Sequence, residues 1–251
     1  MHIVVLAKVV PDYEIPSSDF KLVENRAHAK YKRMIGLYDE NAIEVGVQLK
    51  EKYAADLTIV SYGSSGDVQF LRKGVAMGAD KIVLIEGTSD DPYTTAVNLQ
   101  KGIETLGEID VILAGRQSSD MDRGIVPGLL AGLMKYAFVP QICALENEGG
   151  GWKVTQITET GLRLMKVTGR AVFSVTSIPE NKPRIPAVRA IFSAKKKPVE
   201  KLSEKEEPLT NISEISVRIP LEESICEFIP TEAIDETARI LLSRLKEERY
   251  L

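Results

Sequence analysis

Apolar runs alternate with amphipathic segments over the first two thirds of the chain. Four apolar runs lie at residues 3–8, 57–60, 81–86 and 110–114. Apolar and polar positions do not alternate within them, so each is expected to be a strand buried on both faces. Helical spacing separates them at residues 38–53, 67–77 and 92–106. This order favours a doubly wound, nucleotide-binding-like α/β fold with a mostly parallel sheet and helices on both faces.

Residues at the ends of these segments predict the helix and strand boundaries. Asp39 is expected to be the N-cap of the first helix, and Gly78 the C-cap of the second. A turn of small residues is expected at 61–66, after the second strand. Beyond Tyr136 the pattern becomes β-like, with a glycine-rich turn at 147–151 and a further apolar strand at 170–176.

The last quarter of the chain has a different composition. We expect an α/β domain over residues 1–193 and a charged C-terminal arm with an amphipathic helix over 194–251. Residues 194–208 are strongly charged and contain almost no core residues, so alone they should be extended or mobile. A final helix is predicted from Thr231, as N-cap, to Tyr250. Its apolar face can dock on another chain or fold back on its own domain.

Composition excludes several classes of function. A net charge of −4 gives no electrostatic reason to expect nucleic acid binding, and no apolar run is long enough to span a membrane. The two cysteines, Cys143 and Cys226, show neither metal-ligand spacing nor a disulfide framework, which favours a reducing, cytoplasmic location. The common hydrolase, metalloprotease and P-loop motifs are absent, so no catalytic set and no metal site is predicted.

The most informative segment is VILAGRQSSDMDRGIVPGLLAGLM, residues 111–134. It predicts a strand, a polar loop and a helix with Ile125, Leu129, Leu130, Leu133 and Met134 on one side, the unit that binds ligands at the carboxyl edge of a parallel sheet. Backbone N–H groups at the helix start would face an anion, and the glycines would let a ligand approach closely. The alternatives are an ordinary connecting turn, or an acid–base pair or magnesium site at Asp120 and Asp122.

Two further groups of residues are candidates for binding. Tyr13, Tyr38 and Tyr62 each lie near the end of an element, at the expected rim of the sheet, where they can stack on a planar ring. Residues 184–197 combine apolar side chains, prolines and three lysines, which predicts a projecting loop for protein recognition. The partner-binding candidates in this loop are Val188, Ile191, Lys195, Lys196 and Lys197.

Several of these segments together resemble the β subunit of electron transfer flavoprotein. They are IVVLAKVVPDYE, YDENAIEVGVQLKE, IVSYGSS followed by VAMGADK, VILAGRQSSDMD, and the PR…AKKK region. The resemblance implies an electron carrier without its own catalytic set, paired with an α subunit that holds most of the FAD. It also implies a structural AMP in the β subunit, an arm that wraps the partner, and electrons arriving from dehydrogenases such as acyl-CoA dehydrogenases.

The resemblance also assigns site residues. Tyr13 and Tyr38 correspond to aromatic residues that approach the flavin, and Val188 to the apolar anchor of the loop that docks dehydrogenases. The nucleotide site would be formed by Ala7, Ser61, Tyr62, Gly63, Gly115, Arg116, Gln117, Asp120, Asp122, Arg123, Gly124, Ile125 and Val126.

One departure from the family pattern leaves the ligand of this site open. AMP-binding members usually show Asn-Gln-Thr-Gly after the aspartates, and flavin-bifurcating members Thr-Ala-Gln-Val-Gly, whereas this chain has RGIVPG at 123–128. Pro127 removes an N–H that would face a phosphate, while Arg123 can supply a guanidinium–phosphate contact. AMP, a second FAD of a bifurcating complex, and an empty site are the alternatives. A stand-alone adenine-nucleotide-binding module is a further reading.

Overall fold

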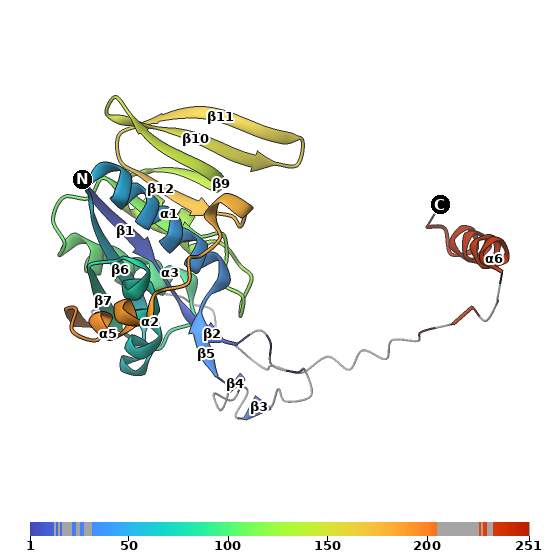
Figure 1. The fold of residues 1–251 in the computed structure, drawn as a ribbon, viewed down its shortest axis with the longest axis horizontal. Coiled ribbons are helices and arrows are strands. Elements are labelled where there is room, and N and C mark those ends of the chain that lie inside the picture. Colours follow the sequence, from blue (N-terminus) through green and yellow to red (C-terminus); the bar gives the residue numbers. More distant parts are fainter. Residues whose placement is uncertain are drawn as a thin grey trace.

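The computed structural model of the chain describes residues 1–12, 14, 16, 22–23, 26–27, 32–204, 226, 228–229 and 233–250. Its centre is a nine-stranded sheet in the order β11-β10-β9-β12-β8-β1-β6-β7-β13 (Figure 1). The strands are β1 (His2–Leu6), β6 (Asp56–Gly63), β7 (Lys81–Glu86), β8 (Val111–Gly115), β9 (Ala137–Glu148), β10 (Gly151–Thr158), β11 (Gly161–Thr168), β12 (Ala171–Val175) and β13 (Val199–Ser203). Two small two-stranded antiparallel sheets lie outside this sheet: β2 (Val9–Pro11) with β5 (Arg33–Ile35), and β3 (Leu22–Val23) with β4 (Arg26–Ala27).

The sheet is mostly parallel and changes its winding direction beside β1. β1 pairs in parallel with β6 on one side and with β8 on the other. The chain runs outward through β6 and β7 and then returns to place β8 next to β1. The doubly wound α/β fold expected from the sequence is confirmed. In such sheets, ligands bind beyond the carboxyl ends of the strands at this change of direction.

Helices cover both faces of the parallel strands. They are α1 (Leu37–Tyr53), α2 (Val68–Met77), α3 (Pro92–Glu104), α4 (Val126–Met134), α5 (Val188–Ala194) and α6 (Ile234–Glu247), with short 3₁₀ helices η2 (Ser65–Asp67) and η3 (Pro179–Asn181). Alternate residues of β1 belong to two cores. Ile3 and Val5 pack with residues of α1 and α2, and Val4 and Leu6 with residues of α3 and α4. Two-sided burial explains why consecutive residues of β1 are apolar instead of alternating with polar ones.

An antiparallel extension carries the sheet beyond these layers. β9, β10 and β11 pair antiparallel in succession, and the turn predicted at 147–151 joins β9 to β10 through Gly149 and Gly150, which both have positive φ. One face of this extension is covered, with Trp152 buried and in edge contact with Phe173. On β11, Leu162 and Leu164 are exposed. The extension therefore leaves apolar surface at this edge of the sheet.

Several predicted boundaries are shifted in the structure. The second strand runs on to Gly63, so half of the turn expected at 61–66 is strand. Helix 67–77 begins at Val68, after η2, and ends as expected with Gly78 as its C-cap. The predicted helix 92–106 ends at Glu104.

The charged segment that was expected to leave the domain at 194 first returns to the sheet. Residues 199–203 form β13, which pairs in parallel with β7 as an edge strand. The sheet therefore continues ten residues beyond the predicted boundary. The final helix, α6, begins at Ile234 with Ala233 as N-cap, whereas the predicted N-cap Thr231 lies outside the described residues.

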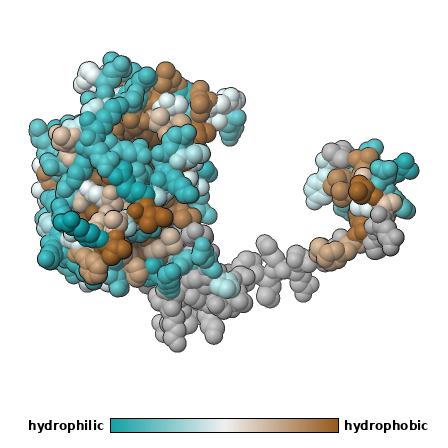
Figure 2. Space-filling view, viewed as in Figure 1, coloured by the Kyte–Doolittle hydropathy of each residue, from teal (hydrophilic) through white to brown (hydrophobic). Residues whose placement is uncertain are grey.

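α6 buries none of its residues, and Figures 1 and 2 show it apart from the α/β body with apolar side chains on its surface. Ile234, Leu241 and Leu242 are all exposed. The described helices include none that is long and apolar enough to cross a lipid bilayer.

Candidate functional site

A cavity of about 320 Å³ opens at the carboxyl ends of β1, β6, β7 and β8. Its wall comes from the segment after β1, the end of β6, the loop after β7, the start of α3, and the polar loop between β8 and α4. This is the edge of the sheet at which the strand order reverses. The cavity therefore lies where doubly wound sheets bind their ligands.

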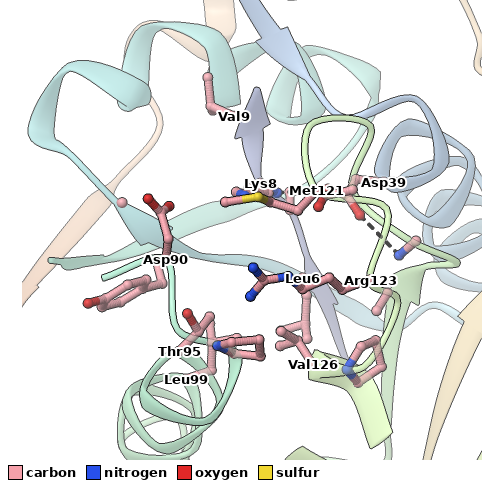
Figure 3. Close-up of a pocket in the computed structure, with 18 of the residues that line it drawn as sticks. Leu6, Lys8, Val9, Asp39, Asp90, Thr95, Leu99, Met121, Arg123 and Val126 are labelled. Atoms are coloured by element: carbon pink, nitrogen blue, oxygen red, sulfur yellow. Dashed lines mark hydrogen bonds between the residues drawn. The ribbon is translucent and has the colours of Figure 1, made fainter. Parts of the chain in front are cut away.

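One side of the cavity is apolar. Leu6, Val60, Leu99, Ala114 and Val126 contribute to it. Figure 3 shows Leu6, Leu99 and Val126 close together, with Arg123 reaching across them and Met121 above. A planar aromatic ring can bury its faces against such side chains, and polar groups on the opposite side can then fix its orientation.

Three cationic side chains line the same cavity. The Lys8 ammonium lies 2.7 Å from Asp120 Oδ2. The Arg33 guanidinium lies 2.5 Å from Asp67 Oδ1 and also donates to the Val9 carbonyl oxygen. Arg123 forms no ion pair with the part of the chain that the structure describes. Of these three cations, Arg123 is therefore the one whose guanidinium remains available to an anionic ligand.

Asp39 connects the two strands at which the sheet changes direction. Its carboxylate accepts hydrogen bonds from the backbone N–H of Lys8, at 2.8 Å, and of Gly115, at 3.1 Å. Figure 3 shows the Asp39 carboxylate at the wall of the cavity. The predicted role of Asp39 as an N-cap is wrong, because the N-cap of α1 is Gly36 and Asp39 lies inside the first turn. Burial raises the pKa of Asp39 to about 7, although both N–H groups and the Lys8 ammonium favour the carboxylate.

Two glycines of the predicted site make room for carboxylates of the protein itself. A Cβ on Gly115 would lie 2.4 Å from Asp39 Oδ1, and a Cβ on Gly63 would lie 2.5 Å from Asp67 Oδ2. Contacts that short do not occur, so a side chain at either position would displace the carboxylate. The glycines of the 111–134 segment were predicted to let a ligand approach closely; the structure shows that Gly115 also makes room for Asp39, and Gly63, outside that segment, for Asp67.

The structure brings most of the predicted nucleotide-site residues together. The residues that line the cavity are Ala7, Tyr62, Gly63, Gly115, Gln117, Arg123, Gly124, Ile125 and Val126. Ile125 was expected on the apolar side of the helix, but it is the N-cap of α4 and 48% exposed, so it lies at the rim.

Other predicted residues lie beside the cavity without lining it. Ser61 is buried, and its hydroxyl has no hydrogen-bond partner within the described chain. Arg116 lies over the Tyr38 ring, with its Cζ 5.8 Å from the ring centroid. Asp120 reaches the wall through its ion pair with Lys8, and Asp122, at positive φ, accepts a 2.9 Å hydrogen bond from Gln117. Tyr13 lies outside the described residues.

Sequence reasoning missed the loop after β7 and two of the cations. Residues 87–90 line the cavity, as do Lys8 and Arg33. The signal for the loop was present, because GTSDDP follows a buried strand directly, as the polar loop after β8 does. Arg33 had no comparable signal, since its place depends on the antiparallel pairing of β5 with β2, which carries it to the cavity.

The comparisons with known proteins agree with this geometry. The model of the electron transfer flavoprotein domain matches residues 26–207. The electron transfer flavoprotein subunit beta of Syntrophomonas wolfei subsp. wolfei is 36% identical over 176 residues, 69% of this chain and 69% of the relative. The subunit of the same name from Mycobacterium tuberculosis (strain ATCC 25618 / H37Rv) is 32% identical over 213 residues, 79% of this chain and 77% of the relative. That from Bradyrhizobium diazoefficiens is 33% identical over 205 residues, 79% and 80% of the two chains.

The chain belongs to the electron transfer flavoprotein β-subunit family. The resemblance found in the sequence motifs is therefore confirmed, and with it an electron-transfer role. Since 69–80% of each of these relatives is aligned, the match covers the body of the fold and is not limited to single motifs.

In this family member, the segment predicted to be a recognition loop contains a helix. Residues 188–194 form α5, which packs against α2 through the buried Ala194, whereas Val188 is 71% exposed. Ile191 and Phe192 are exposed on the same helix, and the Lys195 ammonium lies 5.5 Å from the centre of the Phe192 ring. Lys196 is exposed, and Lys197 Nζ lies 3.8 Å from Asp80 Oδ1.

Proposed function

We propose that the chain is the β subunit of a heterodimeric electron transfer flavoprotein. It would carry electrons from flavoprotein dehydrogenases, such as acyl-CoA dehydrogenases, to a downstream acceptor through an FAD held mainly by the α subunit. Membership of the family supports the electron-transfer role. When bound, the flavin supplies the redox chemistry. The role of this chain is to position the flavin and the partners, which is what a protein contributes to a cofactor reaction.

We further propose that the cavity binds AMP. The observation that carries this proposal is the Arg123 guanidinium, which lies over an apolar wall without an ion pair in the described chain. The apolar residues would bury the adenine ring, and Arg123 would pair with the phosphate. A cavity of about 320 Å³ is near the lower end of the range of about 300–1,000 Å³ for ligand sites, which favours a mononucleotide over a second FAD.

Two surfaces are proposed to bind partners. α6 exposes an apolar face and buries no residue, so its burial against the α subunit would stabilise the heterodimer. The exposed residues Val188, Ile191 and Phe192 of α5, with Lys195, Lys196 and Lys197 after them, would dock the dehydrogenase. An apolar centre with a charged rim is the usual anatomy of such interfaces.

Co-expression with an α subunit tests the carrier role. The heterodimer is expected to hold FAD that an acyl-CoA dehydrogenase reduces, whereas the chain purified alone should hold none. Val188→Asp should slow this reduction at least tenfold without changing FAD content, because it places a charge in the docking surface. Leu162→Asp is the matched control, since Leu162 on β11 is 72% exposed, similar to Val188. Stoichiometric FAD on the chain alone would contradict a shared flavin site.

A further inference from the structure

Glu204, the residue directly after β13, is hydrogen-bonded to a wall of the cavity. Its backbone N–H donates to the Glu86 carbonyl oxygen at 3.0 Å, which extends the pairing of β13 with β7. Its carboxylate accepts a 2.5 Å hydrogen bond from the Tyr62 hydroxyl and a 3.3 Å hydrogen bond from Asn98. Glu204 therefore joins β13 to β6 and α3.

Tyr62 in turn helps to shape the cavity. Its ring lines the cavity and lies directly on Gly87, where a Cβ would be 2.4 Å from the Tyr62 hydroxyl oxygen. The same oxygen accepts the N–H of Ser89 at 3.1 Å, and Gly87 and Ser89 both line the cavity. Burial, together with the bond to Glu204, raises the pKa of Tyr62 to about 12, so the hydroxyl remains a donor at neutral pH.

β13 has few other side-chain contacts that hold it on the sheet. It is an edge strand, and only Val199 and Leu202 are even half-buried. Its ion pair between Lys201 and Glu86, at 3.0 Å, is solvent-exposed, and exposed pairs contribute little. The hydrogen bond from Tyr62 to a carboxylate is of the stronger, charge-assisted kind. The attachment of β13 thus depends strongly on the position of one cavity residue.

We propose that Glu204 is a positioning residue that couples the cavity to β13 through Tyr62. A nucleotide that packs against Tyr62 stabilises the pairing of β13 with β7, and a paired β13 holds Tyr62 and the 87–90 loop in the conformation that binds the nucleotide. Because the C-terminal arm follows β13 in sequence, ligand binding would also fix the point from which the arm leaves the sheet. This inference rests on the proposed binding of AMP in the cavity.

The test combines calorimetric titration of AMP into the full-length chain with amide hydrogen exchange of the peptide that contains residues 199–203. Saturating AMP should slow exchange of this peptide at least about fivefold, the lower end of typical coupling between sites. Tyr62→Phe and Glu204→Leu should each weaken AMP binding and abolish the slowing. The loss of AMP affinity in the double variant should be smaller than the sum of the losses in the two single variants, because both single variants remove the hydrogen bond between Tyr62 and Glu204.

Two controls separate this coupling from general loosening. Tyr53→Phe removes a hydroxyl that exchanges two hydrogen bonds with Asn147, far from β13, and should leave AMP affinity unchanged. Lys201→Met removes the exposed ion pair of β13 without touching Tyr62, and AMP should still slow exchange of the peptide. Binding of AMP without slowed exchange, or wild-type AMP affinity in Glu204→Leu, would overturn the coupling alone. Absence of AMP binding to the wild type would overturn the proposed ligand and the coupling with it.

Discussion

Replacing Asp39 with asparagine should change how folding stability depends on pH. The rise of the Asp39 pKa from 3.8 to about 7 corresponds to about 4 kcal/mol, at about 1.36 kcal/mol per pKa unit. Below pH 3.8 this carboxyl is protonated in both the folded and the unfolded chain. Between pH 4 and 7 the unfolded chain releases the proton first, so the free energy of unfolding falls by up to about 4 kcal/mol as the pH rises.

The asparagine variant is neutral throughout and lacks this loss. It does lose an acceptor, because the Nδ2 group replaces one of the two oxygens that bind the N–H groups of Lys8 and Gly115. A buried N–H left without a partner costs about 1–3 kcal/mol. The variant should therefore be less stable than the wild type near pH 4 and at least as stable near pH 8.

Urea denaturation of both proteins at several pH values between 4 and 8 measures the difference. Asp80→Asn is the matched control, because Asp80 also accepts a backbone N–H, from Leu57. Burial raises the pKa of Asp80, but the Lys50 ammonium and the Leu57 N–H lower it by more. The pKa of Asp80 therefore lies below its ordinary value. The stability that Asp80 contributes is lost as the pH falls, whereas the stability linked to Asp39 is lost as the pH rises. A difference between wild type and Asp39→Asn that stays constant from pH 4 to 8 would refute the reasoning.

Two further predictions concern the cavity. Arg123→Gln should weaken AMP binding about 10- to 150-fold, the equivalent of about 1.5–3 kcal/mol for a hydrogen bond to a charged group. Calorimetry measures this loss. Arg116→Gln is the control, because the Arg116 guanidinium lies over the Tyr38 ring, and it should bind AMP as the wild type does. Gly115→Ala should lower the free energy of unfolding by about 1–3 kcal/mol, because its Cβ would lie 2.4 Å from the Asp39 carboxylate. Gly132→Ala, in α4 with no atom within 4 Å of its Cβ, should be neutral or stabilising in the same denaturation assay.

Local sequence predicted the central fold because two-sided burial leaves a strong signal. Strand 81–86 has four consecutive apolar residues, 82–85, and a small residue follows it at Gly87; the structure has this strand at the predicted bounds. Gly78 ends its helix as predicted, since its φ of +144° is unfavourable for other residues. These features depend on a residue and its immediate neighbours.

The features that the sequence did not predict depend on residues far apart in the chain. Asp39 matches the pattern of an N-cap, but its partners come from β1 and β8, 31 and 76 positions away. The composition of residues 199–203 predicts a charged arm and not a strand, because pairing at a sheet edge uses backbone groups and buries only two of these side chains in part. Arg33 reaches the cavity through the pairing of two three-residue strands, β2 and β5, that are not consecutive in the chain. None of these has a local pattern that distinguishes it from an ordinary surface residue.

The most direct test of the account is the nucleotide content of the heterodimer. The chain would be co-expressed with an α subunit and the complex purified. Acid would release the bound nucleotides, and chromatography would quantify FAD and AMP. We expect one FAD and one AMP per heterodimer, with AMP lost from the Arg123→Gln complex. Two FAD without AMP, or one FAD with no second nucleotide, would contradict the assignment of the cavity as a mononucleotide site.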